Sequence, residues 1–329
     1  MPDERIDVVG IGNALVDVIT HEDDGFVHRQ GLVKGSMTLI DTDRAEQLYQ
    51  AMGPGVEMSG GSAANTMTGI ASFGGSAGYL GKVADDQLGE VFAHDLRAVG
   101  VAFPWRPAQM GVPTGRCLIL VTPDAQRTMS TYLGVSELLA PPDIDEDLVA
   151  RGRITYLEGY LWDRPEAMEA FRKAAAISHA AGGKVSLTLS DSFCVARHRD
   201  AFLDLVAGAV DVLFANEAEI KELYQVPTFD DALQEVRRHC EVAALTRSAK
   251  GSVVVAGDEV HVIDAHPVER VVDTTGAGDL YASGFLFGLT QGCDLATCGR
   301  LGSLAAAEVI THVGARPLTS LQRLAEQVL

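Results

Sequence analysis

The residues best suited to chemistry lie in the segment Asp273–Asp279, which reads Asp-Thr-Thr-Gly-Ala-Gly-Asp. An apolar pair precedes it and a helical pattern follows it, so Gly276, Ala277 and Gly278 would open a helix. The free N–H groups of a helix start, together with the helix dipole, attract anions, and glycine lets the backbone come close to one. Asp279 could then accept a proton from a hydroxyl group that attacks a phosphoryl group. The other interpretation is a glycine-rich loop in which Asp279 only begins a helix.

A second candidate is the segment Gly60–Asn65, which precedes the helix-like stretch Thr66–Ser72. Gly60 and Gly61 could let the backbone approach a polyol, and Asn65 could offer both a donor and an acceptor to vicinal hydroxyls. An ordinary helix start explains the same residues equally well.

The third candidate is Gly10–Asp17, directly after the first apolar run. It begins like a dinucleotide-binding fingerprint, but Leu15 stands where a third glycine belongs, so NAD binding is disfavoured. Asn13 and Asp17 could instead bind hydroxyl groups at the end of a strand, since a carboxylate accepts two hydrogen bonds from a diol. The alternative for Asp17 is a solvated side chain.

The fourth candidate, Asn216-Glu-Ala-Glu219, follows the strand pattern of Val210–Phe214. Asn216 is typical of a helix N-cap and Glu219 of its capping-box partner. The same two residues could also organise the water ligands of Mg²⁺, and the two interpretations are compatible.

The sequence lacks the signature motifs of several other chemistries. The sequence has no G-x-x-x-x-G-K-[ST] loop, no Cys/His cluster and no G-x-S-x-G elbow, which disfavours a P-loop kinase, a structural zinc site and a hydrolase.

The elements that must position these residues alternate between short apolar runs and helical patterns. Strands are expected at Ile6–Gly12, Ile154–Leu157, Lys184–Leu189, Val210–Phe214 and Val242–Thr246, and helices at stretches such as Arg164–Ala181 and Asp200–Ala207. This order predicts a doubly wound, mostly parallel sheet with helices on both faces. Ser252–Val255 and Glu259–Ile263 read as a hairpin around Gly257-Asp258.

Two segments, about 13–42 and about 102–133, alternate polar and apolar residues instead, with Arg116–Val121 the clearest strand. They predict a small second sheet that forms a lid over a single α/β unit. Its core would comprise about 1–12, 43–101 and 134–329.

Composition limits the possible partners. The 329 residues include 26 Lys and Arg against 45 Asp and Glu, a net charge of -19. Such a surface disfavours nucleic acid as a partner. The chain has no apolar run of about 18 residues, and its first five residues are not typical of a signal peptide, so we expect a cytoplasmic protein without membrane contact. The oligomeric state stays open between monomer and homodimer.

Taken together, the motifs resemble the ribokinase (PfkB) family of carbohydrate kinases over essentially the whole chain. Gly60–Asn65, running on to Gly81–Gly89, resembles the first family signature, and Asp273–Asp279 resembles the second. The resemblance implies a ribokinase-like fold and transfer of a phosphoryl group from ATP. It makes Asp279 the catalytic base, Gly276–Gly278 the anion hole, and Asp17, Gly61 and Asn65 ligands of sugar hydroxyls.

The same resemblance implies cofactor sites. Asn216-x-x-Glu219 matches the magnesium-associated motif, and Thr246–Gly251 matches the T-x-G-x-x-G nucleotide motif, with Ser248 in place of the first glycine. Asp273 and Thr275 match residues that line a monovalent-cation site in several members, with Gly314 on a later loop, so K⁺ is a possible further cofactor.

Within the family the chain is most similar to the adenosine kinases, through Gly12–Asp17, Pro113–Cys117 and Tyr156–Leu161. The resemblance implies phosphorylation of the 5′-hydroxyl of a nucleoside, adenosine to AMP. A purine base needs an apolar slot, which Tyr160, Phe193 and the lid residues Leu15, Leu39 and Leu133 could supply. Two alternatives stay open. One is a kinase for ribose, fructose or 2-keto-3-deoxygluconate, where Arg116 and Arg127 would allow an acidic sugar. The other is a non-catalytic protein that binds a nucleoside or sugar.

Overall fold

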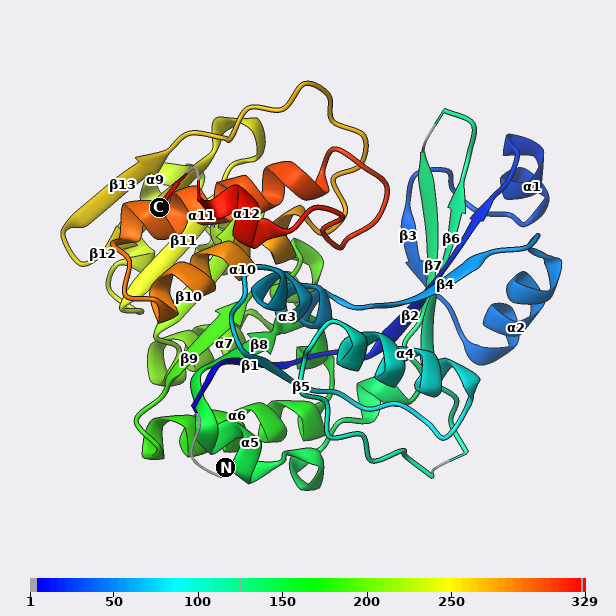
Figure 1. Cartoon of the computed structure of the whole chain (residues 1–329), viewed down its shortest axis with the longest axis horizontal. Coiled ribbons are helices and arrows are strands. Elements are labelled where there is room, and N and C mark those ends of the chain that lie inside the picture. Colours follow the sequence, from blue (N-terminus) through cyan, green and yellow to red (C-terminus); the bar gives the residue numbers. More distant parts are fainter. Residues whose placement is uncertain (1–4, 110, 125, 327) are drawn as a thin grey trace.

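The computed structural model describes residues 5–109, 111–124, 126–326 and 328–329, and Figure 1 shows two bodies of unequal size. The strands are β1 (Ile6–Ile11), β2 (Leu15–His21), β3 (Met37–Leu39), β4 (Val56–Gly60), β5 (Ala77–Leu80), β6 (Gly115–Val121), β7 (Arg127–Tyr132), β8 (Gly152–Glu158), β9 (Lys184–Thr188), β10 (Val212–Asn216), β11 (Val242–Thr246), β12 (Ser252–Ala256) and β13 (Glu259–Ile263).

The α-helices are α1 (Asp24–Arg29), α2 (Thr42–Ala51), α3 (Ser62–Ser72), α4 (Gln87–Ala98), α5 (Glu146–Arg151), α6 (Pro165–Ala180), α7 (Ser192–Ala209), α8 (Glu217–Tyr224), α9 (Phe229–Val236), α10 (Ala277–Thr290), α11 (Leu295–Val309) and α12 (Leu321–Ala325). Short 3₁₀ turns lie at Gly134–Leu138, Pro141–Asp143, Gly159–Asp163 and Ser248–Lys250.

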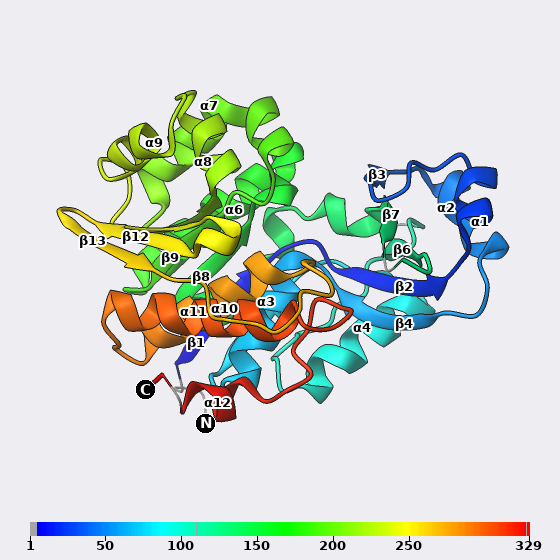
Figure 2. The same cartoon turned by 90° about the horizontal axis from the view of Figure 1, so that it is seen from above.

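The large sheet has the strand order β13-β12-β11-β10-β9-β8-β1-β5. Its pairs from β5 to β11 are parallel, and β12 and β13 complete it as an antiparallel hairpin. Helices α5 to α9 pack on one face through one apolar cluster, and α3, α4, α10 and α11 pack on the other through a second (Figure 2). The predicted doubly wound sheet with helices on both faces is confirmed.

The small sheet has the order β3-β7-β6-β2-β4 and carries α1 and α2 on one side through the cluster around Val18, Phe26 and Leu48. The predicted second sheet is therefore present. The small sheet includes one strand more than predicted, because β4 pairs with β2. The pairing runs from Leu15 opposite Gly60 to Ile19 opposite Val56, and α2 lies beside this sheet. The prediction that all of 43–101 belongs to the core is therefore wrong at this strand. The segment Val56–Gly60 alternates apolar and polar residues over only five positions, too short a signal to assign it to either sheet, and its pairing with β2 decides its place.

Parallel strands direct their carboxyl ends to one edge of a sheet, and the small sheet stands off this edge in Figure 1. The chain passes from β1 to β2 through Gly12–Ala14 and from β4 to α3 through Gly61. The candidate residues of both signatures therefore lie where the two sheets meet.

Candidate functional site

The N-terminus of α10 forms the centre of the site. Gly276 is its N-cap and has φ 78°, a left-handed conformation that favours glycine. A Cβ at Gly276 would come within 2.7 Å of Ala315, whereas a Cβ at Gly278 would meet nothing within 4 Å. The first turn at Gly278 therefore borders open space, as an anion site requires, while the N–H of Ala277 donates to the carbonyl of Thr274 at 3.2 Å.

Asp279 lies in this first turn, and two side chains of α3 hold its carboxylate. Ser62 Oγ donates to Oδ1 at 2.6 Å and Asn65 Nδ2 donates to Oδ2 at 3.1 Å. Burial raises the pKa of Asp279, and these two hydrogen bonds oppose the rise. The two signatures, more than 200 residues apart, thus meet in a fixed carboxylate beside the anion site, where a base for phosphoryl transfer would be needed.

Asn13 is buried and belongs to a hydrogen-bonded group that the sequence did not reveal. Its backbone N–H and its Nδ2 both donate to Glu158 Oε1, at 3.2 and 3.0 Å, and its Oδ1 accepts from Ser136 Oγ at 2.9 Å. Glu158 Oε2 accepts from the N–H of Ala63 at 2.8 Å. Burial raises the pKa of Glu158 to about 7, against these donors. Glu158 ends a buried strand, so periodicity could not distinguish it from its apolar neighbours.

Asp17 projects from β2 beside the loop of the first signature. A Cβ at Gly60 would lie 2.5 Å from its Cγ, so only glycine lets the carboxylate occupy this place, and Gly61 follows with φ 92° as the N-cap of α3. Burial raises the pKa of Asp17 to about 6, while Arg316 and Arg127 oppose the rise and Asp279 adds to it. Asp17 and Asn65 therefore both lie close to Asp279, as ligands of neighbouring hydroxyls would.

An ion pair joins the two sheets at this point. Arg127 Nη1 of β7 lies 3.0 Å from Asp273 Oδ2, and the two side chains are 7% and 9% exposed. Asp273 Oδ1 also accepts from the N–H and Oγ1 of Thr275, and Oδ2 accepts from the N–H of Gly314. The predicted potassium site at these residues stays a prediction. In the observed arrangement Arg127 already supplies a positive charge to Asp273.

The two aromatic candidates differ in their position. Tyr160 is half-buried, its N–H donates to Ser190 Oγ, and burial followed by the carboxylates of Asp191 and Asp279 raises its pKa. Tyr160 therefore lies within electrostatic reach of Asp279. Phe193 is 76% exposed in the first turn of α7, so the structure does not bring it into a pocket with Tyr160.

Asn216 and Glu219 form the predicted capping box at the start of α8. Asn216 Oδ1 accepts from the N–H groups of Ala218 and Glu219, and Glu219 accepts from the N–H of Asn216 at 2.9 Å and from its Nδ2 at 2.6 Å. Burial raises the pKa of Glu219 to about 7. Its oxygens already have donors, so this donor set fits Mg²⁺ through water ligands rather than by direct contact.

The nucleotide motif keeps its backbone despite the missing glycine. Ser248 has φ 53°, the left-handed conformation that glycine would adopt, at a cost of roughly 1–2 kcal/mol. It opens the short turn that ends at Gly251, and only Arg247 separates it from Thr246 at the end of β11. A Cβ at Gly251 would collide with Ile263 and Ala265, so this turn packs tightly against the strand end of β13.

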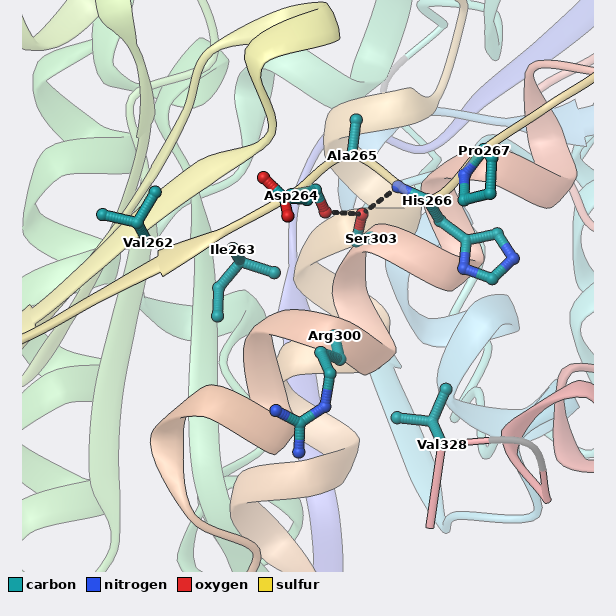
Figure 3. Close-up of a pocket in the computed structure, with 9 residues that line it drawn as sticks. All are labelled: Val262, Ile263, Asp264, Ala265, His266, Pro267, Arg300, Ser303 and Val328. Atoms are coloured by element: carbon teal, nitrogen blue, oxygen red, sulfur yellow. Dashed lines mark hydrogen bonds between the residues drawn. The ribbon is translucent and has the colours of Figure 1, made fainter.

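A hollow of about 320 Å³ lies on the other side of that strand end (Figure 3). Ser303 Oγ of α11 ties its wall together by accepting from the N–H of His266 at 2.8 Å and donating to the carbonyl of Asp264 at 3.1 Å. Gly302 packs against the Tyr281 carbonyl, so this part of α11 lies about one helical turn from the N-terminus of α10. The remaining lining residues are Val262, Ile263, Ala265, Pro267, Arg300 and Val328.

Sequence reasoning missed Ser62, Glu158 and Arg316 and considered Arg127 only as a ligand of acidic sugars. Arg316 Nε donates to Asn65 Oδ1 at 3.4 Å from the loop after α11. The run Gly314-Ala-Arg-Pro317 was the available signal, because an arginine beside a loop glycine is typical of an anion site. As a whole, the arrangement brings a helix N-terminus, a buried carboxylate and further polar side chains together, and such a set suits phosphoryl transfer to an alcohol.

Comparison with known proteins gives the same family from sequence and from structure. The family model described as pfkB family carbohydrate kinase matches residues 33–321. An adenosine kinase from Saccharomyces cerevisiae is 26% identical, with 93% of this chain and 95% of that protein covered.

Two solved structures have a higher sequence identity to this chain. The adenosine kinase from Sinorhizobium meliloti has a TM-score of 0.91 and 54% identity, over 99% of this chain and 100% of that one. A probable sugar kinase protein from Rhizobium etli has a TM-score of 0.92 and 49% identity, with 99% and 100% covered. Within the part of the chain that the structure describes, no helix is long and apolar enough to cross a membrane.

Proposed function

The chain belongs to the pfkB family of carbohydrate kinases, and from that premise we propose that it phosphorylates the 5′-hydroxyl of adenosine to give AMP. Its kinase relatives make it an ATP-dependent kinase that acts on a hydroxyl group. The observation that carries the finer proposal is the meeting of Asp279 with Asn65 and Asp17 at the anion site. A ribose ring offers a primary hydroxyl and a vicinal diol, the two features that this set of groups would recognise. The 54% identity to an adenosine kinase supports the same substrate.

In this proposal each residue has one role. Asp279 accepts the proton of the 5′-hydroxyl, because it lies next to the N–H groups of α10 that face the anion. Those N–H groups and Arg127 stabilise the charge on the transferring phosphoryl group. Asp17 and Asn65 hold the diol, while Glu158 fixes Asn13 and the start of α3 behind them.

The nucleotide would extend from the anion site along the turn Ser248–Gly251, with its base near the hollow at Ser303. Asn216 and Glu219 would hold Mg²⁺ through water ligands, and the ion would neutralise phosphate charge when bound. The net charge of -19 makes such local positive charge necessary, because the surface as a whole repels ATP.

A second candidate is a kinase for a free sugar. One observation favours it: Phe193 is 76% exposed, so it gives no wall to a purine slot in this arrangement. The 49% identity to a probable sugar kinase points the same way.

A screen of adenosine, inosine, ribose, fructose and 2-keto-3-deoxygluconate separates these candidates. Thermal shift reports binding, and ADP release reports phosphoryl transfer. A ligand at 100 times its Kd should stabilise the fold by about 2.7 kcal/mol. We expect adenosine to raise the Tm and to support ADP release. A response to a free sugar and to no nucleoside would overturn adenosine as substrate, and a Tm shift without ADP release would indicate a binding protein.

A further inference from the structure

The loop 311–319, between α11 and α12, is held in place by one buried carboxylate. Glu308 Oε1 accepts from the N–H of Leu318 at 2.9 Å and from that of Thr319 at 2.7 Å, and Oε2 lies 3.3 Å from Nε2 of His312. The Glu308 side chain is 7% exposed. Because both ends of the loop bind the same group, its middle has a defined position.

That middle reaches the site at three consecutive residues. The N–H of Gly314 donates to Asp273, Ala315 packs against Gly276, and Arg316 reaches Asn65 of α3. The first two contacts shape the anion site. The third brings a guanidinium to the side on which the acceptor substrate would bind.

Arg316 contacts the end of the Asn65 amide opposite to the one that donates to Asp279. Its Nε donates to Asn65 Oδ1 at 3.4 Å, and Asn65 Nδ2 then donates to Asp279 Oδ2 at 3.1 Å. The two ends of an amide are almost equal in shape, so hydrogen bonds alone decide its orientation. A flipped Asn65 would direct its carbonyl oxygen at the Asp279 carboxylate and repel it.

Arg316 also brings charge to the acceptor side. Its guanidinium lies within electrostatic reach of Asp17, Asp95 and Tyr79, and its Nη2 is enclosed without a hydrogen-bond partner among the described residues. An enclosed guanidinium nitrogen without a partner is costly unless a neighbouring anion compensates for it. Asp17 is the neighbour whose charge affects Arg316 most.

We propose that Arg316 is a positioning residue, which fixes the amide of Asn65 so that it donates to Asp279 and which brings a positive charge to the side of Asp17, the proposed ligand of the substrate diol. The second role rests on the proposed function, since it needs an acceptor with vicinal hydroxyls. The first role holds for any acceptor that the enzyme phosphorylates.

A double-mutant cycle tests the first role. Arg316→Met removes the donor at similar length, Asn65→Ala removes the amide, and the double variant removes both. A lost charge-assisted hydrogen bond in such a place lowers kcat by about 10- to 100-fold. We expect Arg316→Met to lose that much, and the double variant to be no slower than Asn65→Ala alone. Additive losses, or an Arg316→Met enzyme within twofold of wild type, would overturn the proposal. Arg323→Met, an exposed arginine on α12, is the matched control.

Arg316→Lys separates the two roles and covers the case in which Arg316→Met does not fold. Lysine keeps the charge but not the Nε donor, so kcat should fall while the pH dependence of KM stays that of wild type. The groups that face Asp17 are Arg316 from the loop, Arg127 from β7, Asp279 from α10 and Cys117 from β6. Loss of the charge should raise the pKa of Asp17, so in Arg316→Met the rise of KM at low pH should begin at a higher pH. An unshifted profile in Arg316→Met would contradict the charge role.

The assays use adenosine, or ribose if wild type phosphorylates ribose and not adenosine. Failure of wild type on adenosine would refute the proposed substrate and leave the coupling of Arg316 to Asn65 measurable on ribose. Failure of that coupling on an acceptor that wild type does phosphorylate would refute the inference alone.

Discussion

Asp279→Asn removes the proposed proton acceptor and leaves every neighbouring hydrogen bond possible. The asparagine oxygen can accept from Asn65 Nδ2, and its NH₂ group can donate to Ser62 Oγ, because a hydroxyl both donates and accepts. The shape and the polar contacts of the site are therefore retained, and only the basic group is lost.

The size of the effect follows from the chemistry. A positioned general base contributes about 10²- to 10⁴-fold. The loose transition state of phosphoryl transfer demands little from the base, so we expect the lower half of this range, a 10²- to 10³-fold loss of kcat. That corresponds to about 3–4 kcal/mol of barrier. The Kd for adenosine should stay within a few-fold of wild type, because the diol ligands are unchanged.

The free energy of unfolding of the Asp279→Asn variant should not fall below that of wild type. Burial raises the pKa of Asp279, so the folded state binds this proton more tightly than the unfolded chain does. Stability due to this group therefore decreases as pH rises from its ordinary pKa through the raised one, and above that range the ionised group opposes folding. A neutral asparagine removes that cost, so the Tm should be equal or higher.

The assay is nucleoside-dependent ADP release at saturating ATP, with adenosine binding measured by calorimetry. Asp294→Asn makes the same chemical change at the N-cap of α11, where asparagine caps as well as aspartate, and should leave kcat unchanged. Turnover of Asp279→Asn within tenfold of wild type would refute Asp279 as the base.

Four further outcomes are expected. Arg127→Met removes the guanidinium that the small sheet places beside Asp273, and kcat should fall by about 10²-fold. An unchanged rate in the ADP-release assay would contradict this. KM for adenosine should rise as pH falls below about 6, where Asp17 becomes protonated; a flat profile from pH 5 to 8 would count against Asp17 as a diol ligand. Glu158→Gln should lower the free energy of unfolding, measured with urea, by about 1–3 kcal/mol, because its NH₂ group would face a backbone N–H donor. A higher free energy of unfolding would refute the assigned contacts. Ser303→Trp should fill the hollow and raise the KM for ATP but not for adenosine. A raised KM for adenosine alone would refute the placement of the adenine base of ATP near Ser303.

Much of the core could be predicted because its signals are local. The strands β1, β8, β9, β10 and β11 are short apolar runs between helical patterns, and the expected hairpin appears as β12 and β13. The capping box Asn216–Glu219 was predictable for the same reason, since all its contacts lie within one helical turn. The strand β4 was not, because its only support is pairing with β2.

The sequence by itself indicated the reaction class, because Gly60–Asn65 and Asp273–Asp279 together resemble the two signatures of one kinase family. Only the tertiary structure decided which distant groups meet the segment Asp273–Asp279. Ser62 and Asn65 reach Asp279 from across more than 200 residues, and Arg127 reaches Asp273 from the other sheet. Arg316 is set by a loop that Glu308 folds back. Such contacts depend on how elements pack, and no periodicity or local spacing encodes them.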